Sequence, residues 1–204
     1  MKVRVFYFIC SMKELNASYW EERYQSAQTG WDIGYPSPAL IEYFKRSVPK
    51  DASILIPGAG RAYEAEWLLN NEYSKVTIVE WSATAIEQAL ERAPVLKRAE
   101  LVVGDFFTHD GQYDCIMEQT FFCALNPSQR PDYAKKMKTL LKPEGVLMGL
   151  LFNFPLSEQG PPFGGSEEEY QSLFDKHFEI RSLAIATNSI KPRQGREFFI
   201  ELIA

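Results

Sequence analysis

The stretch ILIPGAGRAYEAEWL, residues 54–68, joins an apolar run to a glycine turn and then to a helical pattern. Gly58 and Gly60 let the backbone approach a ligand closely, and the following helix would present its positive N-terminus there. A dinucleotide-binding loop has a third glycine three residues after the second, but this chain has Tyr63 at that position. The chain therefore keeps the glycine turn but lacks the third glycine, which in dinucleotide-binding proteins allows close helix–strand packing beside a pyrophosphate.

Two further predicted strands end in residues that suit an adenosine. Glu80 ends KVTIVE, 22 residues after Gly58, which is the spacing at which an acidic side chain accepts hydrogen bonds from ribose hydroxyls. Asp105 and Phe106 stand at the end of the next strand, where the carboxylate can accept from an adenine amino group and the ring can flank the base. Ligands of doubly wound sheets bind beyond the carboxyl ends of the strands, so these residues predict one nucleoside site.

A ligand with an adenosine but no pyrophosphate is S-adenosylmethionine (SAM). Its sulfonium is a cation, and contact with an aromatic face stabilises a cation by about 0.5–2 kcal/mol. Trp20, Tyr24 and Trp31 can serve this purpose, since Trp20 and Tyr24 lie one helical turn apart. Aromatic residues on one helix face are also typical of a core, so the cofactor hypothesis depends on the strand ends.

Strands and helices alternate along most of the chain. Strands are predicted at 53–57, 75–80, 99–105, 113–119 and 146–152, and helices at 13–28, 39–48, 62–71, 83–92 and 128–141. Continuous apolar strands alternating with helices are typical of a parallel sheet covered on both faces. The last apolar runs, 180–188 and 196–204, have a short turn-rich link and predict a closing antiparallel hairpin. We predict one α/β domain over residues 1–204.

Composition narrows the possible partners. The chain has 204 residues and a net charge of −5 without a run of basic residues, which argues against nucleic acid. Cys10, Cys115 and Cys123 lack the spacing of a zinc site and their odd number argues against paired disulfides, so we expect a cytoplasmic protein without a metal. No apolar run reaches the length of a membrane span, and nothing demands more than a monomer.

The first eleven residues stand apart, because helical patterning begins only after them. Our hypothesis is that Met12 is the native start and that residues 1–11 are an upstream translation or a disordered lead; an extra edge strand is the alternative. The intact mass of the protein from its own cell would distinguish these, since a chain that begins at Met1 contradicts the hypothesis.

The longer motifs resemble the thiopurine S-methyltransferase family of class I SAM-dependent methyltransferases, with a pattern nearest to the plant halide/thiol methyltransferase branch. The resemblance runs from about Ala17 to the C-terminus, and rests on YWEERYQSAQTGWDIGYPSPAL, ILIPGAGRAYEAEWL, VTIVEWSATAIE, GDFF, FFCALNPSQRPDYAKKMKTLLKPEGVL and QGPPF. It implies a Rossmann-like, doubly wound sheet of seven strands, mostly parallel, with a C-terminal antiparallel hairpin. It also implies that helices within 13–46 form a lid.

The resemblance assigns roles to individual residues. The positions matching the family's SAM contacts are Trp20, Tyr24, Trp31, Gly58, Gly60, Glu80, Asp105, Phe106 and Gln119, and those matching its acceptor pocket are Phe121, Phe122, Phe152 and Phe154. Departures from the plant branch include Ala59 in place of a cysteine and Phe152 in place of a tyrosine. These departures put halide specificity in doubt and leave the cofactor assignment intact.

The expected activity is methyl transfer from SAM to a small soft nucleophile (a thiol, bisulfide, a halide or a thiopurine-like compound), with S-adenosylhomocysteine as the product. An acceptor that is already an anion needs no general base, which suits a chain with two histidines. Arg193 and Arg196 are candidates for holding such an acceptor, and replacing either by methionine is expected to raise the acceptor KM without changing SAM affinity. The alternatives are an oxygen or nitrogen acceptor, an NAD-dependent oxidoreductase, and a non-catalytic SAM-binding protein.

Overall fold

A computed structural model describes residues 14–157 and 159–204, so the interpretation of residues 1–11 lies outside the described residues. Seven strands form one sheet in the order β3-β2-β1-β4-β5-β7-β6. Their bounds are β1 Ser53–Pro57, β2 Lys75–Glu80, β3 Glu100–Val103, β4 Tyr113–Gln119, β5 Leu141–Phe152, β6 Glu179–Ile185 and β7 Glu197–Ile203. β1 to β5 pair in parallel, whereas β7 runs antiparallel to both β5 and β6. The predicted closing hairpin is confirmed.

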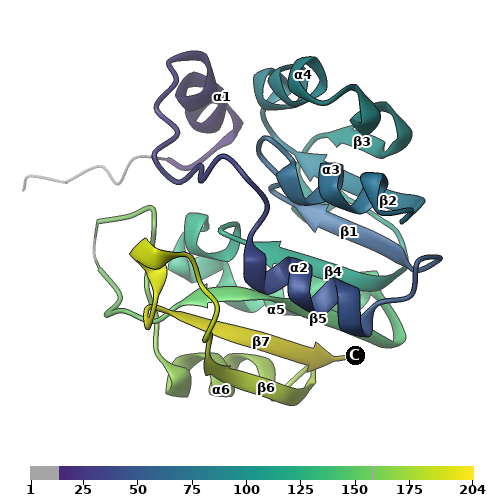
Figure 1. The fold of residues 1–204 in the computed structure, drawn as a ribbon. Helices are drawn as coiled ribbons and strands as arrows, with labels where there is room; N and C mark the ends of the chain where they lie inside the picture. The colour runs from purple at the N-terminus through teal and green to yellow at the C-terminus, as the bar shows by residue number, and fades with distance from the viewer. Residues whose placement is uncertain (1–13, 158) are drawn as a thin grey trace, which may run out of the picture.

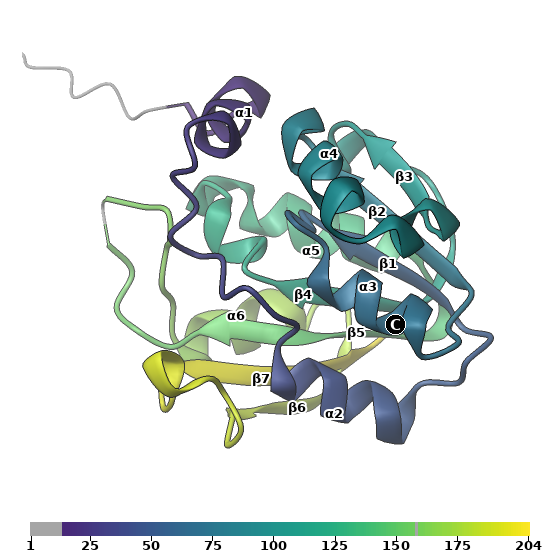
Figure 2. The same ribbon diagram turned by 45° about the horizontal axis from the view of Figure 1, so that its top comes forward.

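Helices cover both faces of the sheet (Figure 2). These are α2 Pro38–Ser47, α3 Tyr63–Asn70, α4 Ala83–Arg92, α5 Arg130–Leu140 and α6 Glu167–Phe174, whereas α1 Ala17–Gln25 stands apart from the sheet and packs beside α4. Within β1, Ile54 and Ile56 pack in a core with α2, α3 and α4, while Leu55 between them packs in a second core with α5 and α6. Successive strand side chains point to opposite faces, so a strand buried on both sides is apolar throughout.

The carboxyl ends of the parallel strands define the edge where the site lies. In Figure 1 the arrowheads of β1 and β4 point toward the side where α1 stands, and β7 points the opposite way. The strand order reverses between β1 and β4, because β2 and β3 lie on one side of β1 and the later strands on the other. A crevice at such a reversal is the usual ligand site of this kind of sheet.

The N-terminal helices differ from the prediction. α1 begins at Ala17 because Asn16 caps it, its Oδ1 accepting from the backbone N–H of Tyr19 at 3.0 Å. α2 is a core helix, since Leu40 and Phe44 are fully buried against the sheet. We therefore restrict the lid proposed for residues 13–46 to α1 and the loop that follows it.

Two elements in the second half of the chain were predicted incompletely. β5 begins at Leu141, before the predicted start at 146, and its pairing with β4 shifts register between Tyr113 and Cys115. α6 was not given bounds from the sequence, although Ser166 followed by three glutamates is a helix-start pattern. Its Tyr170 and Phe174, one turn apart, are buried in the second core.

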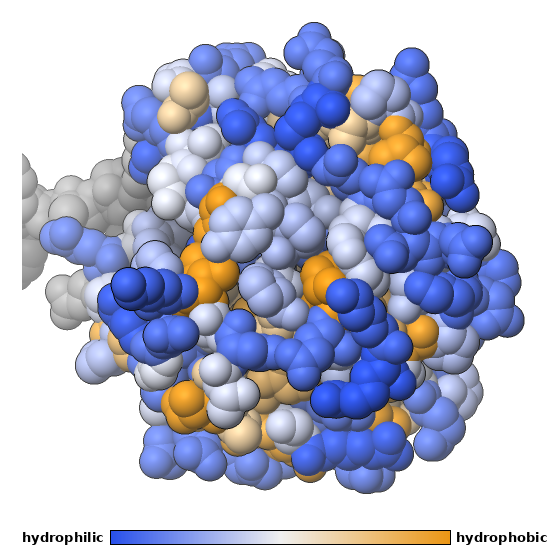
Figure 3. Space-filling view, in the orientation of Figure 1, coloured by the Kyte–Doolittle hydropathy of each residue, from blue (hydrophilic) through white to orange (hydrophobic). Residues whose placement is uncertain are grey.

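One face of the molecule can be judged for a large apolar patch from its surface colouring. On the face drawn in Figure 3, apolar residues occur as separate small patches among hydrophilic ones. Among the described residues, no helix combines the length and the apolar character that crossing a membrane requires.

Candidate active site

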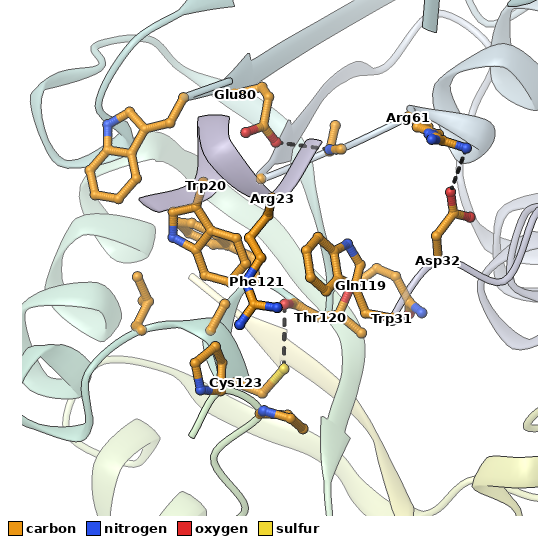
Figure 4. A pocket seen from close by; sticks show the side chains of 18 of the residues that line it. Trp20, Arg23, Trp31, Asp32, Arg61, Glu80, Gln119, Thr120, Phe121 and Cys123 are labelled. Atoms are coloured by element: carbon orange, nitrogen blue, oxygen red, sulfur yellow. Dashed lines mark hydrogen bonds and ion pairs between the residues drawn. The ribbon is translucent and has the colours of Figure 1, made fainter. Parts of the chain in front are cut away.

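A cavity of about 560 Å³ lies at the carboxyl ends of β1, β2 and β4, within the usual range of small-molecule sites. α1 and the loop after it form one wall, the strand ends form the floor, and segments after β5 and before β7 close the side. Figure 4 shows side chains from α1, from the loop after it and from the strand ends gathered around this space. The predicted site residues that line the cavity are Trp20, Tyr24, Trp31, Gly58, Gly60, Glu80, Asp105, Phe106, Gln119, Phe121, Phe152, Phe154, Arg193 and Arg196.

The glycine turn after β1 has a conformation that favours glycine. Gly58 and Gly60 have φ angles of +58° and +55°, in the left-handed region. A Cβ at Gly58 would overlap the ring of Phe121, and one at Gly60 would overlap the hydroxyl of Tyr24. The bare backbone of this turn therefore lies directly against two side chains of the cavity.

Glu80 at the end of β2 supplies a buried carboxylate beside that turn. Its Oε2 accepts from the N–H of Gly60 at 2.9 Å and its Oε1 from the N–H of Ser82 at 3.0 Å. The residue is 6% exposed, and burial raises the pKa of its carboxyl group. Each oxygen retains acceptor capacity for one more donor, which is what a pair of neighbouring hydroxyls would use.

The ends of β3 and β4 add polar and aromatic groups to the floor. Asp105 accepts from the N–H of Phe107 through Oδ1 at 2.9 Å, and the buried ring of Phe106 lies 5.1 Å from that of Phe121. Gln119 has a buried Oε1 without a hydrogen-bond partner among the described residues. A buried acceptor in that state is costly, and a ligand donor would satisfy it.

The aromatic residues above the cavity contact one another edge to face. The rings of Trp20 and Trp31 are 5.5 Å apart at 82°, and those of Tyr24 and Trp31 are 5.8 Å apart at 81°. Two contacts connect this loop to other parts of the cavity wall. Asp32 pairs with Arg61 at 3.3 Å (Figure 4), and Arg193 donates to the carbonyl of Trp31 at 2.9 Å.

The side of the cavity beyond the strand ends is largely apolar. The rings of Phe152 and Phe154 lie 5.0 Å apart, with the guanidinium of Arg193 5.5 Å from the first and that of Arg196 5.2 Å from the second. Pro161, Pro162 and Pro192 continue this wall. Both histidines belong to the described residues, and neither lines the cavity.

The prediction that Phe122 lines the acceptor pocket is wrong. Its side chain is 1% exposed and packs in the second core, 4.9 Å from the ring of Tyr133 and 5.7 Å from that of Tyr170. Glu118 accepts from the N–H groups of both Phe121 and Phe122 through Oε1, at 2.8 and 2.9 Å. This tight turn sends the two neighbouring rings to different places, one to the cavity and one to the core.

Comparison with known families decides the class of protein. A family model described as Thiopurine S-methyltransferase (TPMT) matches residues 15–199. The chain belongs to the thiopurine S-methyltransferase family. This family member is 31% identical over 192 residues to probable thiol methyltransferase 2 of Arabidopsis thaliana, covering 91% of this chain and 84% of that protein. It is 29% identical over 191 residues to thiopurine S-methyltransferase of Acinetobacter baylyi, covering 81% and 86%.

Solved structures confirm the predicted fold. A Burkholderia thailandensis 1,6-didemethyltoxoflavin-N1-methyltransferase with bound S-adenosylhomocysteine superposes with a TM-score of 0.72 at 18% identity, covering 93% of this chain and 87% of that one. Magnesium protoporphyrin IX methyltransferase from Synechocystis, with bound SAM, also gives 0.72, at 9% identity and with 95% and 98% covered. The predicted class I methyltransferase sheet is therefore correct.

The thiopurine S-methyltransferase family member is a SAM-dependent methyltransferase, as predicted. Its cavity fits the cofactor on three independent features. The glycine turn leaves no room for a Cβ, Glu80 presents two acceptor oxygens, and Gln119 has an unsatisfied buried oxygen.

Three further residues of the cavity were not predicted as site residues. Arg23 follows Trp20 by three positions on α1, a helical spacing that signals a shared face, and it donates to Tyr19 Oη at 2.7 Å. Cys123 lines the cavity, but burial raises the pKa of its thiol, and its Sγ donates to the Thr120 carbonyl at 3.3 Å. Glu64 gives no sequence signal, because an acidic residue in the first turn of a helix is ordinary.

Proposed function

We propose that this methyltransferase transfers the methyl group of SAM to a small soft nucleophile, with a thiolate as the preferred class. Proteins similar to this chain are named as thiol, thiocyanate and thiopurine methyltransferases. The observation that carries the proposal is the acceptor side of the cavity, which is built from Phe121, Phe152, Phe154 and prolines and has no histidine. Such a wall suits a polarizable sulfur that arrives already ionised.

The proposed binding mode divides the cavity between the two substrates. Glu80 accepts from the ribose hydroxyls, Asp105 and Phe106 hold the adenine, Gln119 accepts from a donor of the cofactor, and the Gly58–Gly60 turn takes the amino-acid end. Trp20, Tyr24 and Trp31 cover the sulfonium, which supplies the reactive methyl group. Backbone N–H groups hold the carboxylates of Glu80 and Asp105 in fixed positions at the strand ends, which supports this placement.

The proposed mechanism depends on alignment. The nucleophile approaches from the Phe121, Phe152 and Phe154 side, opposite the bond that breaks, so the displacement is in line. Holding both reactants in that geometry can contribute roughly 7–11 kcal/mol. The lid formed by α1 and the 26–37 loop excludes water, which would otherwise solvate and weaken an anionic nucleophile.

The function is tested by S-adenosylhomocysteine formation with iodide, bisulfide, an alkyl thiol, an aromatic thiol, a phenol and an amine offered separately. We expect turnover with the sulfur acceptors and the highest kcat/KM with one of the thiols. Turnover confined to the phenol or the amine would overturn the acceptor assignment. Tight SAM binding without turnover of any acceptor would favour a non-catalytic protein.

The proposal extends to the oligomeric state, the binding partners and the cellular compartment. We propose a monomer that acts on a small molecule in the cytoplasm and does not bind nucleic acid. The net charge of −5 supports the last point, and the free, buried state of Cys115 and Cys123 is compatible with a reducing compartment.

Arg196 and Arg193 are expected to have different roles. No carboxylate of the described residues pairs with Arg196, so Arg196→Met should raise the KM of an anionic acceptor about threefold to tenfold with little change in kcat. Arg193 is already bound to Trp31 and Glu197, which changes the expectation for this residue. Arg193→Met should instead weaken SAM binding by loosening the lid.

Initial-rate kinetics together with SAM titration by calorimetry separate the two arginines. Unaltered acceptor KM in Arg196→Met would remove this residue from acceptor binding. Unaltered SAM affinity in Arg193→Met would show that its contact with Trp31 does not hold the lid.

A further inference from the structure

Glu64 is a buried carboxylate in the cavity wall that the binding mode above leaves unused. It lies in the first turn of α3, directly after the glycine turn, and is 8% exposed. Charged side chains are rarely buried to this degree without a partner, because desolvation of an ion is costly. Its surroundings therefore indicate what it binds.

The contacts of this carboxylate are incomplete. Oε1 accepts from the backbone N–H of Ser37 at 2.9 Å. In the described part of the chain, Oε2 has no hydrogen bond from another residue and no cation forms an ion pair with Glu64. Arg193 is a nearby cation, but its guanidinium is committed to Trp31 and Glu197.

The position of Glu64 matches one end of the cofactor. Residues 58–60 and the start of α3 follow one another along the chain and line the same cavity. The binding mode proposed above puts the amino-acid end of SAM at this turn. SAM carries two cations of different chemistry. The sulfonium has no hydrogen to donate and suits aromatic faces, whereas the α-ammonium has three donors and suits a carboxylate oxygen.

We propose that Glu64 binds the α-ammonium group of SAM through Oε2 and so selects a cofactor that carries an intact amino-acid end. The inference rests on the proposed placement of the cofactor over the glycine turn and does not depend on the identity of the acceptor. Ser37 positions the carboxylate by holding Oε1, and Oε2 of this cavity-lining residue stays available for the ammonium.

A proton-linked effect follows from the same geometry. Burial raises the pKa of Glu64, the N–H of Ser37 and its own N–H oppose this, Arg193 lowers it and Asp32 raises it. An ammonium placed beside the carboxylate favours the ionised form and lowers its pKa. Below the raised pKa of the free protein, cofactor binding should therefore release a proton from Glu64.

The test compares two ligands by calorimetry on the full chain. S-adenosylhomocysteine has the amino-acid end, and 5′-methylthioadenosine has the same adenosine and a thioether without it. Glu64→Gln should weaken S-adenosylhomocysteine binding at least about tenfold, since it removes a charge-assisted hydrogen bond, and should change 5′-methylthioadenosine binding less than about twofold. Glutamine keeps an oxygen for Ser37, so the fold is preserved.

Glu66→Gln is the matched control, because Glu66 lies on the same helix, pairs with Arg92 and is absent from the cavity wall. It should leave both affinities unchanged. Titrations across the acidic pH range, in buffers of different ionisation enthalpy, should show more proton release with S-adenosylhomocysteine than with 5′-methylthioadenosine in the unmodified chain. This difference should disappear in Glu64→Gln, since Glu80, whose pKa is also raised, meets the ribose of both ligands.

The possible outcomes separate this inference from the proposed function. Equal losses for both ligands in Glu64→Gln, or no loss for either, would overturn the role of Glu64 while leaving the methyltransferase site in place. Failure of the unmodified chain to bind either ligand would overturn the placement of the cofactor as well.

Discussion

Glu80→Ala is expected to lower SAM affinity by about 100-fold or more, the largest effect of any single change in the cavity. Two charge-assisted hydrogen bonds to the ribose would be lost. The N–H groups of Gly60 and Ser82, which now donate to the carboxylate, would also lose their partner, so the turn that holds the cofactor would loosen. The effect on kcat/KM should follow the effect on binding.

Calorimetric titration with SAM measures this loss. Glu80→Gln should have an intermediate effect, because its amide can accept from only one of the two N–H groups and directs a donor at the other. Glu87→Ala, exposed on the neighbouring α4, serves as the control and should bind SAM normally. A Glu80→Ala variant that binds SAM within threefold of the unmodified chain would disprove the ribose assignment.

Glu118→Ala is expected to reduce the free energy of unfolding by about 3–5 kcal/mol. The carboxylate is fully buried and accepts three donors, the N–H groups of Phe121 and Phe122 and the hydroxyl of Tyr133 at 2.6 Å. Alanine would leave all three unpaired in an apolar core and would fill none of the vacated volume. The ring of Phe121 would also lose its fixed position against the glycine turn.

The pH dependence at Glu118 has a definite sign. Burial raises the pKa of Glu118 to about 7, against an ordinary value of 4.5. Between these two pH values the folded chain holds a proton on Glu118 that the unfolded chain has lost. The stabilisation that this proton gives the folded state is therefore complete below about pH 4.5 and is lost as the pH rises through about 7. Relative to the non-titrating Glu118→Gln, the unmodified chain should be more stable at pH 5 than at pH 8.

Urea unfolding at pH 5 and pH 8 of the unmodified chain, Glu118→Ala, Glu118→Gln and Tyr133→Phe tests the loss of stability and its pH dependence. Tyr133→Phe removes a single donor and is expected to cost about 1 kcal/mol, well below Glu118→Ala. A stability difference between the unmodified chain and Glu118→Gln that is independent of pH would show that Glu118 does not titrate with a raised pKa. Unfolding of Glu118→Ala at the same urea concentration as the unmodified chain would show that its hydrogen bonds contribute little.

Regular elements and their ends could be predicted from local sequence. β1, β2, β4 and α4 begin and end where the pattern places them, because continuous apolar runs and a capping serine are local signals. Strand ends of a parallel sheet converge, so the predicted residues Gly58, Glu80 and Asp105 do lie in one cavity although they are distant in sequence. The family followed from longer motifs that local patterns alone do not explain.

The tertiary structure decided which side chains of irregular segments reach the cavity. Phe121 and Phe122 are identical in type and adjacent, yet one lines the cavity and the other packs in the core. The turn that separates them is held by hydrogen bonds that both N–H groups donate to Glu118. The commitment of Arg193 to Trp31, 162 positions away, is likewise invisible in the sequence. Long charged side chains can pair with segments distant in sequence, and the periodicity of the local sequence does not indicate which partner they take.

The roles of α2 and Glu64 also depend on tertiary packing that the local sequence does not show. The sequence predicted a helix near residues 39–48, and packing of Leu40 and Phe44 against the sheet makes it part of the core instead of the lid. An acidic residue early in α3 is an ordinary sequence feature. It becomes a candidate ligand for an ammonium only because folding buries Glu64 in the cavity wall, with one oxygen paired and the other without a hydrogen bond from the described residues. The electrostatic cost of that state depends on the complete surroundings.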